Sequence, residues 1–181
     1  MWQVTGVDIY ISQGEDEDEA NDDEGSEEYY IRKRWNLNAP FSQDRRPQHL
    51  RPESFHLINS RLLAEGINKE RWGPYVRELR SLLVPGGWLQ MLELRMLFQS
   101  SNNSIPDNSP LRQWSECYDR AMTMMNKEPR IGSRLQALMV EQGFETVQSN
   151  TFDLPIGNWN PGESPGIKRC PSRCPTADLL L

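Results

Sequence analysis

Histidine and cysteine, which often act as bases, nucleophiles or metal ligands, are few in this sequence. Of the two histidines, His49 lies in a proline-rich segment and His56 stands beside the start of a strand-like run, so neither has a credible nucleophile next to it. Cys170 and Cys174 form the spacing CPSRC, but no second cysteine pair and no histidine lies nearby in the sequence. The residue types therefore predict neither a catalytic triad nor a metal site.

Acidic side chains are concentrated in one stretch. Residues 15–28 hold ten acidic residues and no basic one, and the rest of the chain contains 16 acidic and 20 basic residues. We expect residues 14–28 to be a solvated, disordered insertion, because the charges repel one another and almost no apolar residue anchors them. A docking segment for a basic protein partner is the alternative. Basic residues elsewhere are scattered without interleaved aromatic residues, so no specific nucleic-acid partner is expected.

Length and cysteine content narrow the class of protein further. A chain of 181 residues is long enough for one domain with a core. The three cysteines are an odd number and do not resemble a disulfide framework. No signal peptide opens the sequence, and no apolar run reaches the roughly 20 residues that span a bilayer. These features predict a protein of the cytoplasm or nucleus that has no membrane partner.

The elements that must position any functional residue alternate between strand-like and helix-like runs. Runs rich in β-branched, aromatic and aliphatic residues predict five strands. The strands are expected at residues 2–11, 28–38, 55–63, 88–98 and 144–157. Apolar residues at helical spacing, with their start and stop signals, predict three helices. The helices are expected at residues 72–83, from Ser109 as N-cap and Pro110 through Met125, and at residues 131–142 with Gly143 as the cap.

Pro85, Gly86 and Gly87 separate the first of these helices from the strand expected at residues 88–98. That strand is apolar on both faces, which is typical of parallel sheets covered by helices rather than of half-exposed antiparallel sheets. We therefore interpret the Pro-Gly-Gly sequence as a tight turn that follows a crossover helix in a doubly wound α/β sheet.

The helix that starts at Pro110 carries an apolar stripe, which we interpret as core or lid packing rather than as a cofactor site. The stripe consists of Leu111, Trp114, Tyr118, Met122 and Met125.

Six segments of the chain, taken in order and with matching spacing, resemble one family. The segments are VTGVDIYISQ, RWNLNAPF, FHLINSRLL, RWGPYVRELRSLLVPGGWLQMLEL, DNSPLRQW and LPIGNW. They resemble the fungal S-adenosylmethionine-dependent methyltransferases that are grouped with the secondary-metabolism regulators and that use the class I methyltransferase fold. The likeness extends over residues 2–160.

This resemblance implies a fold, a cofactor and an activity. The implied fold is α/β, a Rossmann-like class I methyltransferase sheet with helices on both faces that binds S-adenosyl-L-methionine across its carboxyl edge. Residues 1–162 would form a partial methyltransferase domain, and residues 163–181 would form an irregular tail. The implied activity is methyl transfer to an unknown acceptor, a small molecule or a protein, with a role in secondary metabolism.

The resemblance also implies cofactor-binding residues. Asp8 matches the acid that ends the second strand of the family and accepts hydrogen bonds from the ribose hydroxyls, which suits a carboxylate. The alternative is a structural aspartate that ends a strand. Leu37 and Asn38 match the place where the third strand of the family meets the adenine ring, and the Asn38 amide could bind the edge of that ring.

Candidates for the methyl-transfer pocket follow the next two strands. Asn59, Ser60 and Arg61 match a strand end that lines the pocket, but relatives favour histidine at the position of Asn59, and asparagine cannot act as a base. Arg61 could orient an acceptor carboxylate or pair with a nearby acid. Glu93 could reach the pocket or pair internally. No catalytic residue is assigned, because alignment and exclusion of water can supply much of the acceleration of methyl transfer.

One expected motif is missing from the sequence. The family has a glycine-rich cofactor loop after its first strand, ahead of the segment that starts near Gly6, and no Gly-x-Gly-x-x-Gly or Gly-x-Gly-x-Gly sequence occurs here. We therefore expect the sheet to lack its first strand with that loop, and also its last strand. Three hypotheses remain open: an incomplete record of a methyltransferase, a short non-catalytic protein that acts in protein interaction through its acidic segment, and a different α/β binding module.

Overall fold

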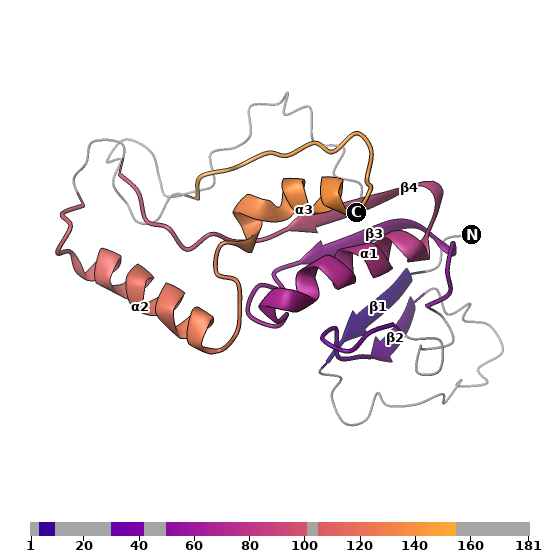
Figure 1. The fold of residues 1–181 in the computed structure, drawn as a ribbon, viewed down its shortest axis with the longest axis horizontal. Helices are drawn as coiled ribbons and strands as arrows, with labels where there is room; N and C mark the ends of the chain where they lie inside the picture. The colour runs from indigo at the N-terminus through magenta and orange to yellow at the C-terminus, as the bar shows by residue number, and fades with distance from the viewer. Residues whose placement is uncertain (1–3, 10–29, 42–49, 101–104, 155–181) are drawn as a thin grey trace. The chain divides into compact units, whose positions relative to one another are not determined.

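The computed structural model describes residues 4–9, 30–41, 50–100 and 105–154. The chain divides into two compact units, residues 1–148 and residues 149–181. All helices and strands of the described residues lie in the first unit, and the described part of the second unit contains none (Figure 1). The expected insertion at residues 14–28 and the expected tail at residues 163–181 lie outside the described residues.

The first sheet pairs β1 (Val4–Asp8) with β2 (Tyr30–Arg34) in parallel. Both strands fall inside the runs predicted from their β-branched and aromatic residues, and the register places Asp8 opposite Arg34. After β2 the chain stays close to the end of β1, because the Trp35 amide donates to the Asp8 carbonyl oxygen at 2.8 Å. The carboxyl ends of the two strands therefore lie at one edge, as parallel pairing requires.

The second sheet is a β–α–β unit. The strand β3 (Phe55–Arg61) leads through the short helix η1 (Lys69–Arg71) into α1 (Trp72–Leu82), and β4 (Leu83–Leu92) returns parallel to β3 (Figure 1). The helix forms where apolar residues recur at helical spacing, and it buries that stripe. The buried residues of α1 are Trp72, Tyr75, Val76, Leu79 and Leu82. The crossover helix and the parallel pairing predicted from the sequence are confirmed.

The Pro-Gly-Gly sequence does not separate the helix from the strand, which corrects our expectation. β4 begins directly after α1, and Leu83 already pairs with Phe55. The next pair is Leu57 with Trp88, so five positions along β4 correspond to two along β3 and the intervening residues form a bulge. Gly86 has φ +80°, a conformation that favours glycine. The sequence correctly indicated a turn here, but it did not indicate that β4 pairs with β3 both before and after this turn.

The remaining elements are helical. α2 (Pro110–Met124) begins at the predicted residue, and its N-cap Ser109 accepts a hydrogen bond from the Arg112 amide. η2 (Ile131–Arg134) continues into α3 (Leu135–Glu141), and Gly143 follows with φ +84°, the left-handed conformation expected of a C-terminal cap.

The prediction of a strand at residues 144–157 is wrong for the described part of that segment. Residues 144–154 contain no strand, and residues 155–157 lie outside the described part of the chain. The strand predicted at residues 88–98 also ends early, because β4 stops at Leu92. Apolar composition identified both segments, but a strand forms only where a neighbouring strand can pair with its backbone.

Helices cover one face of the β3–β4 sheet. Ile58, Leu89 and Met91 alternate toward the core, where side chains of α1 and α3 join the same cluster. On the other face, Trp88 remains 67% exposed, and its register partner Leu57 is also exposed within the described part of the chain. Our expectations of helices on both faces and of strands buried on both faces are therefore not met by the described residues. No helix among those residues is long and apolar enough to cross a membrane.

Candidate functional site

Asn38 joins the segment that leaves β2 to the segment that leaves β3. Its side-chain amide Nδ2 donates to the Gly66 carbonyl oxygen at 2.9 Å, and its Oδ1 accepts from the Asn68 amide at 2.8 Å. Lys127 reinforces the same junction, because its Nζ donates to Gly66 O and to Asn68 Oδ1, both at 2.8 Å. The loops at the carboxyl ends of the two parallel sheets are thus held together, and these ends are where open α/β sheets bind ligands.

A buried arginine fixes the same segment to α1. Arg71 is 7% exposed, and its guanidinium donates to the carbonyl oxygens of Leu37 at 2.9 Å and Ala39 at 3.0 Å. Its charge is paired with Glu78, whose Oε2 also accepts from the Phe41 amide at 3.2 Å. We call Arg71, Glu78 and the backbone of residues 37–41 that they bind the arginine clamp. The residues predicted from the sequence did not include this clamp, because Arg71 follows the charged residues Lys69 and Glu70 and no local pattern marks it as buried.

The predicted cofactor residues take different positions. Asp8 ends β1 and is exposed, at the carboxyl edge. Leu37 is half-buried and packs against the core. The amide of Asn38 is already engaged at both ends, so it holds two loops together and would have to break these bonds to bind another group.

The residues at the end of β3 point to two faces. Ser60 is buried, and its hydroxyl lies 3.2 Å from the hydroxyl of Tyr75 on α1. Asn59 and Arg61 point to the exposed face, where Arg61 Nε donates to Asn59 Oδ1 at 2.7 Å and Asn59 Nδ2 donates to Gln90 Oε1 at 3.0 Å. Arg61 is therefore bound to a neighbouring amide in this structure.

Glu93 follows β4 and closes the loop after β3. Its carboxylate accepts from the amides of Leu63 at 2.8 Å and Ala64 at 3.0 Å, so Glu93 is bound to the backbone of this loop. Burial raises the pKa of Glu93, and the two backbone hydrogen bonds partly oppose this shift. Burial raises the pKa of the Tyr75 and Tyr118 phenols, and the Glu93 carboxylate adds to both shifts.

The raised pKa of Glu93 predicts a specific dependence of stability on pH. Because the folded state holds this proton more tightly than the unfolded state, its contribution to stability is present below the unfolded pKa and is lost as pH rises through the folded pKa. In Glu93→Gln this decline should vanish. Urea unfolding of both proteins at several pH values, together with an NMR titration of the Glu93 carboxyl carbon, measures it. A Glu93 pKa below its ordinary value would contradict the prediction.

Aromatic side chains continue from this edge onto α2. Tyr118 donates to Glu65 Oε1 at 3.1 Å, and its ring stacks on Trp114 with centroids 5.4 Å apart and planes 13° apart. Phe98 lies 5.7 Å from Trp114, with the two ring planes tilted by 59°. We call Phe98, Trp114 and Tyr118 the aromatic ladder. Burial and the Glu65 carboxylate raise the pKa of Tyr118 to about 12, so the phenol is a hydrogen-bond donor at neutral pH.

The stripe on α2 is core packing only in its middle, because Tyr118 and Met122 pack into the core whereas Met125 at its end is 65% exposed. Met122 is 5% exposed and joins the hydrophobic core, whereas Leu111 and Trp114 are exposed. Our interpretation as core packing is confirmed for Met122.

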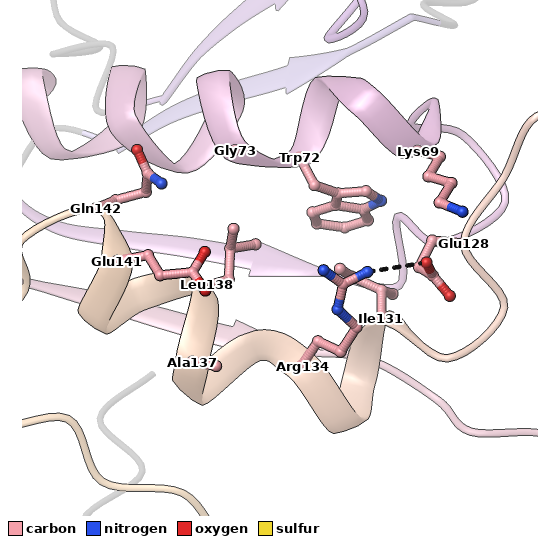
Figure 2. A pocket seen from close by; sticks show the side chains of 10 residues that line it. All are labelled: Lys69, Trp72, Gly73, Glu128, Ile131, Arg134, Ala137, Leu138, Glu141 and Gln142. Atoms are coloured by element: carbon pink, nitrogen blue, oxygen red, sulfur yellow. Dashed lines mark hydrogen bonds and ion pairs between the residues drawn. The ribbon is translucent and has the colours of Figure 1, made fainter.

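A pocket of about 210 Å³ lies between the start of α1 and the η2–α3 segment (Figure 2). Trp72, Leu138 and Ile131 form its apolar wall, and the ion pair of Arg134 with Glu128 crosses it at 3.0 Å. None of the predicted site residues lines this pocket, so we do not assign cofactor binding to it.

The residues that were excluded from catalysis are only partly described. His56 is exposed on β3, and His49, Cys170 and Cys174 lie outside the described residues. Within the described ranges, no three histidine, cysteine, aspartate or glutamate side chains gather as a metal site would require.

Parallel strands joined by a crossover helix, with polar side chains where the strands end, define a mixed α/β protein. Among curated proteins, the chain is similar to several from fungi. It is 32% identical over 79 residues to the probable methyltransferase tdiE of Emericella nidulans, which covers 44% of this chain and 25% of that protein. It is 27% identical over 89 residues to the methyltransferase cpsF of Aspergillus campestris, covering 49% and 31%. It is 28% identical over 105 residues to the secondary metabolism regulator LAE1 of Hypocrea atroviridis, covering 58% and 30%.

These matches confirm the resemblance to a fungal methyltransferase family of the LAE1 type. The matched part is between a quarter and a third of the length of each of the three relatives. No family model and no solved structure matches the chain.

Proposed function

We propose that this chain forms part of an S-adenosylmethionine-dependent methyltransferase whose sheet is of the Rossmann-like class I type. The junction made by Asn38 carries the proposal, because it brings the loop after β2 and the loop after β3 to one place. A methyltransferase must hold its donor and its acceptor side by side, and loops at the carboxyl ends of parallel strands are suited to this. The similarity to fungal methyltransferases supports the same assignment.

Two of the three residues implied by the resemblance, Asp8 and Leu37, would suit the ribose and the adenine ring of the cofactor. The exposed carboxylate of Asp8 could accept two hydrogen bonds from the ribose hydroxyls. Leu37 offers an apolar side chain near the same edge, where an adenine ring could pack. Asn38 does not fit the role implied by the resemblance, since its amide is already bound to two loops.

When bound, the cofactor supplies a methyl group that is already electrophilic because it is attached to a sulfonium. The chain then needs to position the acceptor and exclude water. We propose that the loop after β3, held by the Glu93 carboxylate through the amides of Leu63 and Ala64, forms the acceptor side of the site. The similarity to the secondary metabolism regulator LAE1 supports an acceptor from fungal secondary metabolism.

The Asp8→Asn variant tests this proposal. We expect the purified protein to bind S-adenosylhomocysteine in isothermal titration calorimetry, and the variant to bind about 10- to 100-fold more weakly, because hydrogen bonds to a charged group are worth about 1.5–3 kcal/mol. Asp153→Asn is the matched control, an exposed aspartate outside every described helix and strand, and should bind like the parent. Absence of binding by the parent, or equal affinities of the parent and Asp8→Asn, would refute the ribose assignment.

A further inference from the structure

The aromatic ladder has surface that the fold does not use. Trp114 stacks on Tyr118 and touches Phe98, yet 48% of it remains exposed, and no other aromatic ring pairs with it within the described residues. Isolated exposed apolar side chains are ordinary, but three aromatic rings in a row form a surface of a specific kind. Its flat rings suit a flat, apolar partner.

The ladder is anchored to the loop that follows β3. Tyr118 is at one end of the ladder, and its hydroxyl donates to Glu65 Oε1 at 3.1 Å. Further along α2, Met122 inserts into the core, and Lys127, just beyond the helix, binds the Gly66 carbonyl oxygen at 2.8 Å. The ladder therefore starts beside the proposed acceptor loop and extends outward from it.

Glu65 supplies the negative charge beside Tyr118, since its carboxylate accepts from the Tyr118 hydroxyl at 3.1 Å. Glu93 also acts on this phenol, whereas the charge of Asp119 is paired with Arg130 at 3.1 Å. Glu65 uses one oxygen to accept from Tyr118, and its second oxygen has no hydrogen-bond partner in the part of the chain that the structure describes. A ligand that meets this surface should therefore bring a hydrogen-bond donor or a positive charge rather than an acid.

We propose that the aromatic ladder and Glu65 bind a planar aromatic amine, with the ring on Trp114 and the nitrogen directed to the Glu65 carboxylate. The inference rests on the proposed function in one respect, since such a compound would be the methyl acceptor. The ring is held by stacking, and the amine is held by a charge-assisted hydrogen bond. Together they would place the nitrogen beside the loop after β3.

Three probes separate the ring from the charge. Tryptamine has both the aromatic ring and the ammonium group, indole-3-propionate keeps the ring but carries a carboxylate, and 2-cyclohexylethylamine keeps the amine without an aromatic ring. We expect calorimetry, without any cofactor, to give the tightest binding for tryptamine, and binding about tenfold weaker for each of the others, because each lacks one of the two interactions.

Variants assign the binding to this surface. Trp114→Ala and Glu65→Gln should each weaken tryptamine binding about tenfold, and Trp114→Phe should retain part of it because a ring remains. Trp88→Ala is the matched control, since Trp88 is an exposed tryptophan on the outer face of the β3–β4 sheet, and its removal should leave the affinity unchanged. Circular dichroism checks that each variant is folded.

The outcomes are distinct from those for the cofactor. Equal binding of tryptamine and indole-3-propionate, equal effects of Trp114→Ala and Trp88→Ala, or no saturable binding of tryptamine would each overturn the inference. If S-adenosylhomocysteine fails to bind but tryptamine binds as expected, the aromatic-amine site stands and the methyltransferase proposal fails.

Discussion

Replacing Arg71 by methionine should lower the free energy of unfolding by about 3–5 kcal/mol, because the substitution leaves the half-buried Glu78 carboxylate without its partner. It also removes the donors that bind the carbonyl oxygens of Leu37 and Ala39. Urea unfolding measures the loss of stability. Hydrogen exchange should in addition show faster exchange of amides in residues 35–41, because the arginine clamp no longer holds them.

Two further variants show whether the loss comes from the clamp. Arg77→Met removes an exposed arginine of the same helix that donates to Gln142 Oε1 at 3.0 Å, and it should change stability by less than about 1 kcal/mol. Combining Arg71→Met with Glu78→Leu removes both charges and should recover part of the loss. Equal effects of Arg71→Met and Arg77→Met would show that the clamp does not stabilise the fold.

Gly87→Ala is expected to destabilise the protein by about 1–3 kcal/mol, the range for overpacking a filled site. A Cβ at this position would lie 3.0 Å from the Val84 carbonyl oxygen and 3.2 Å from the His56 carbonyl oxygen. Both are backbone atoms and cannot rotate away, and His56 belongs to β3. The methyl group would therefore push the two strands apart where β4 resumes its pairing.

Gly66→Ala is the control for this prediction. A Cβ there would meet only the Leu63 carbonyl oxygen at 3.6 Å, an ordinary contact, and the backbone has no positive φ. Its stability should change by less than about 1 kcal/mol, since no atom has to move. Thermal or urea unfolding of both variants decides the matter, and a loss in Gly87→Ala no greater than in Gly66→Ala would contradict the close approach.

The two glycines of the Pro-Gly-Gly sequence show which features can be predicted from neighbouring residues alone. A turn residue was expected at this point, and Gly86 does adopt a positive φ. Nothing local indicates that Leu83 pairs with Phe55 before the turn, because that pairing depends on where β3 lies. The close approach at Gly87 is likewise set by the neighbouring strand.

For Asn38 in the candidate site, the position was predictable from the sequence but the hydrogen-bond partners were not. Its position after a strand was readable from the sequence, and the resemblance implied contact with adenine. Its partners, Gly66 and Asn68, are about thirty positions away in the sequence, so only the folded chain brings them to its amide. The Arg71 clamp was missed for the same reason.

The sequence by itself determined about where β1 to β3, α1 and α2 form, because periodicity, caps and turn residues act over a few neighbouring positions. It also determined that the strands pair in parallel through a crossover helix. Tertiary structure alone decided which strand faces are covered, why residues 144–154 form no strand, and which loops meet at the carboxyl edge. Those outcomes depend on partners far away in the chain, which no local pattern records.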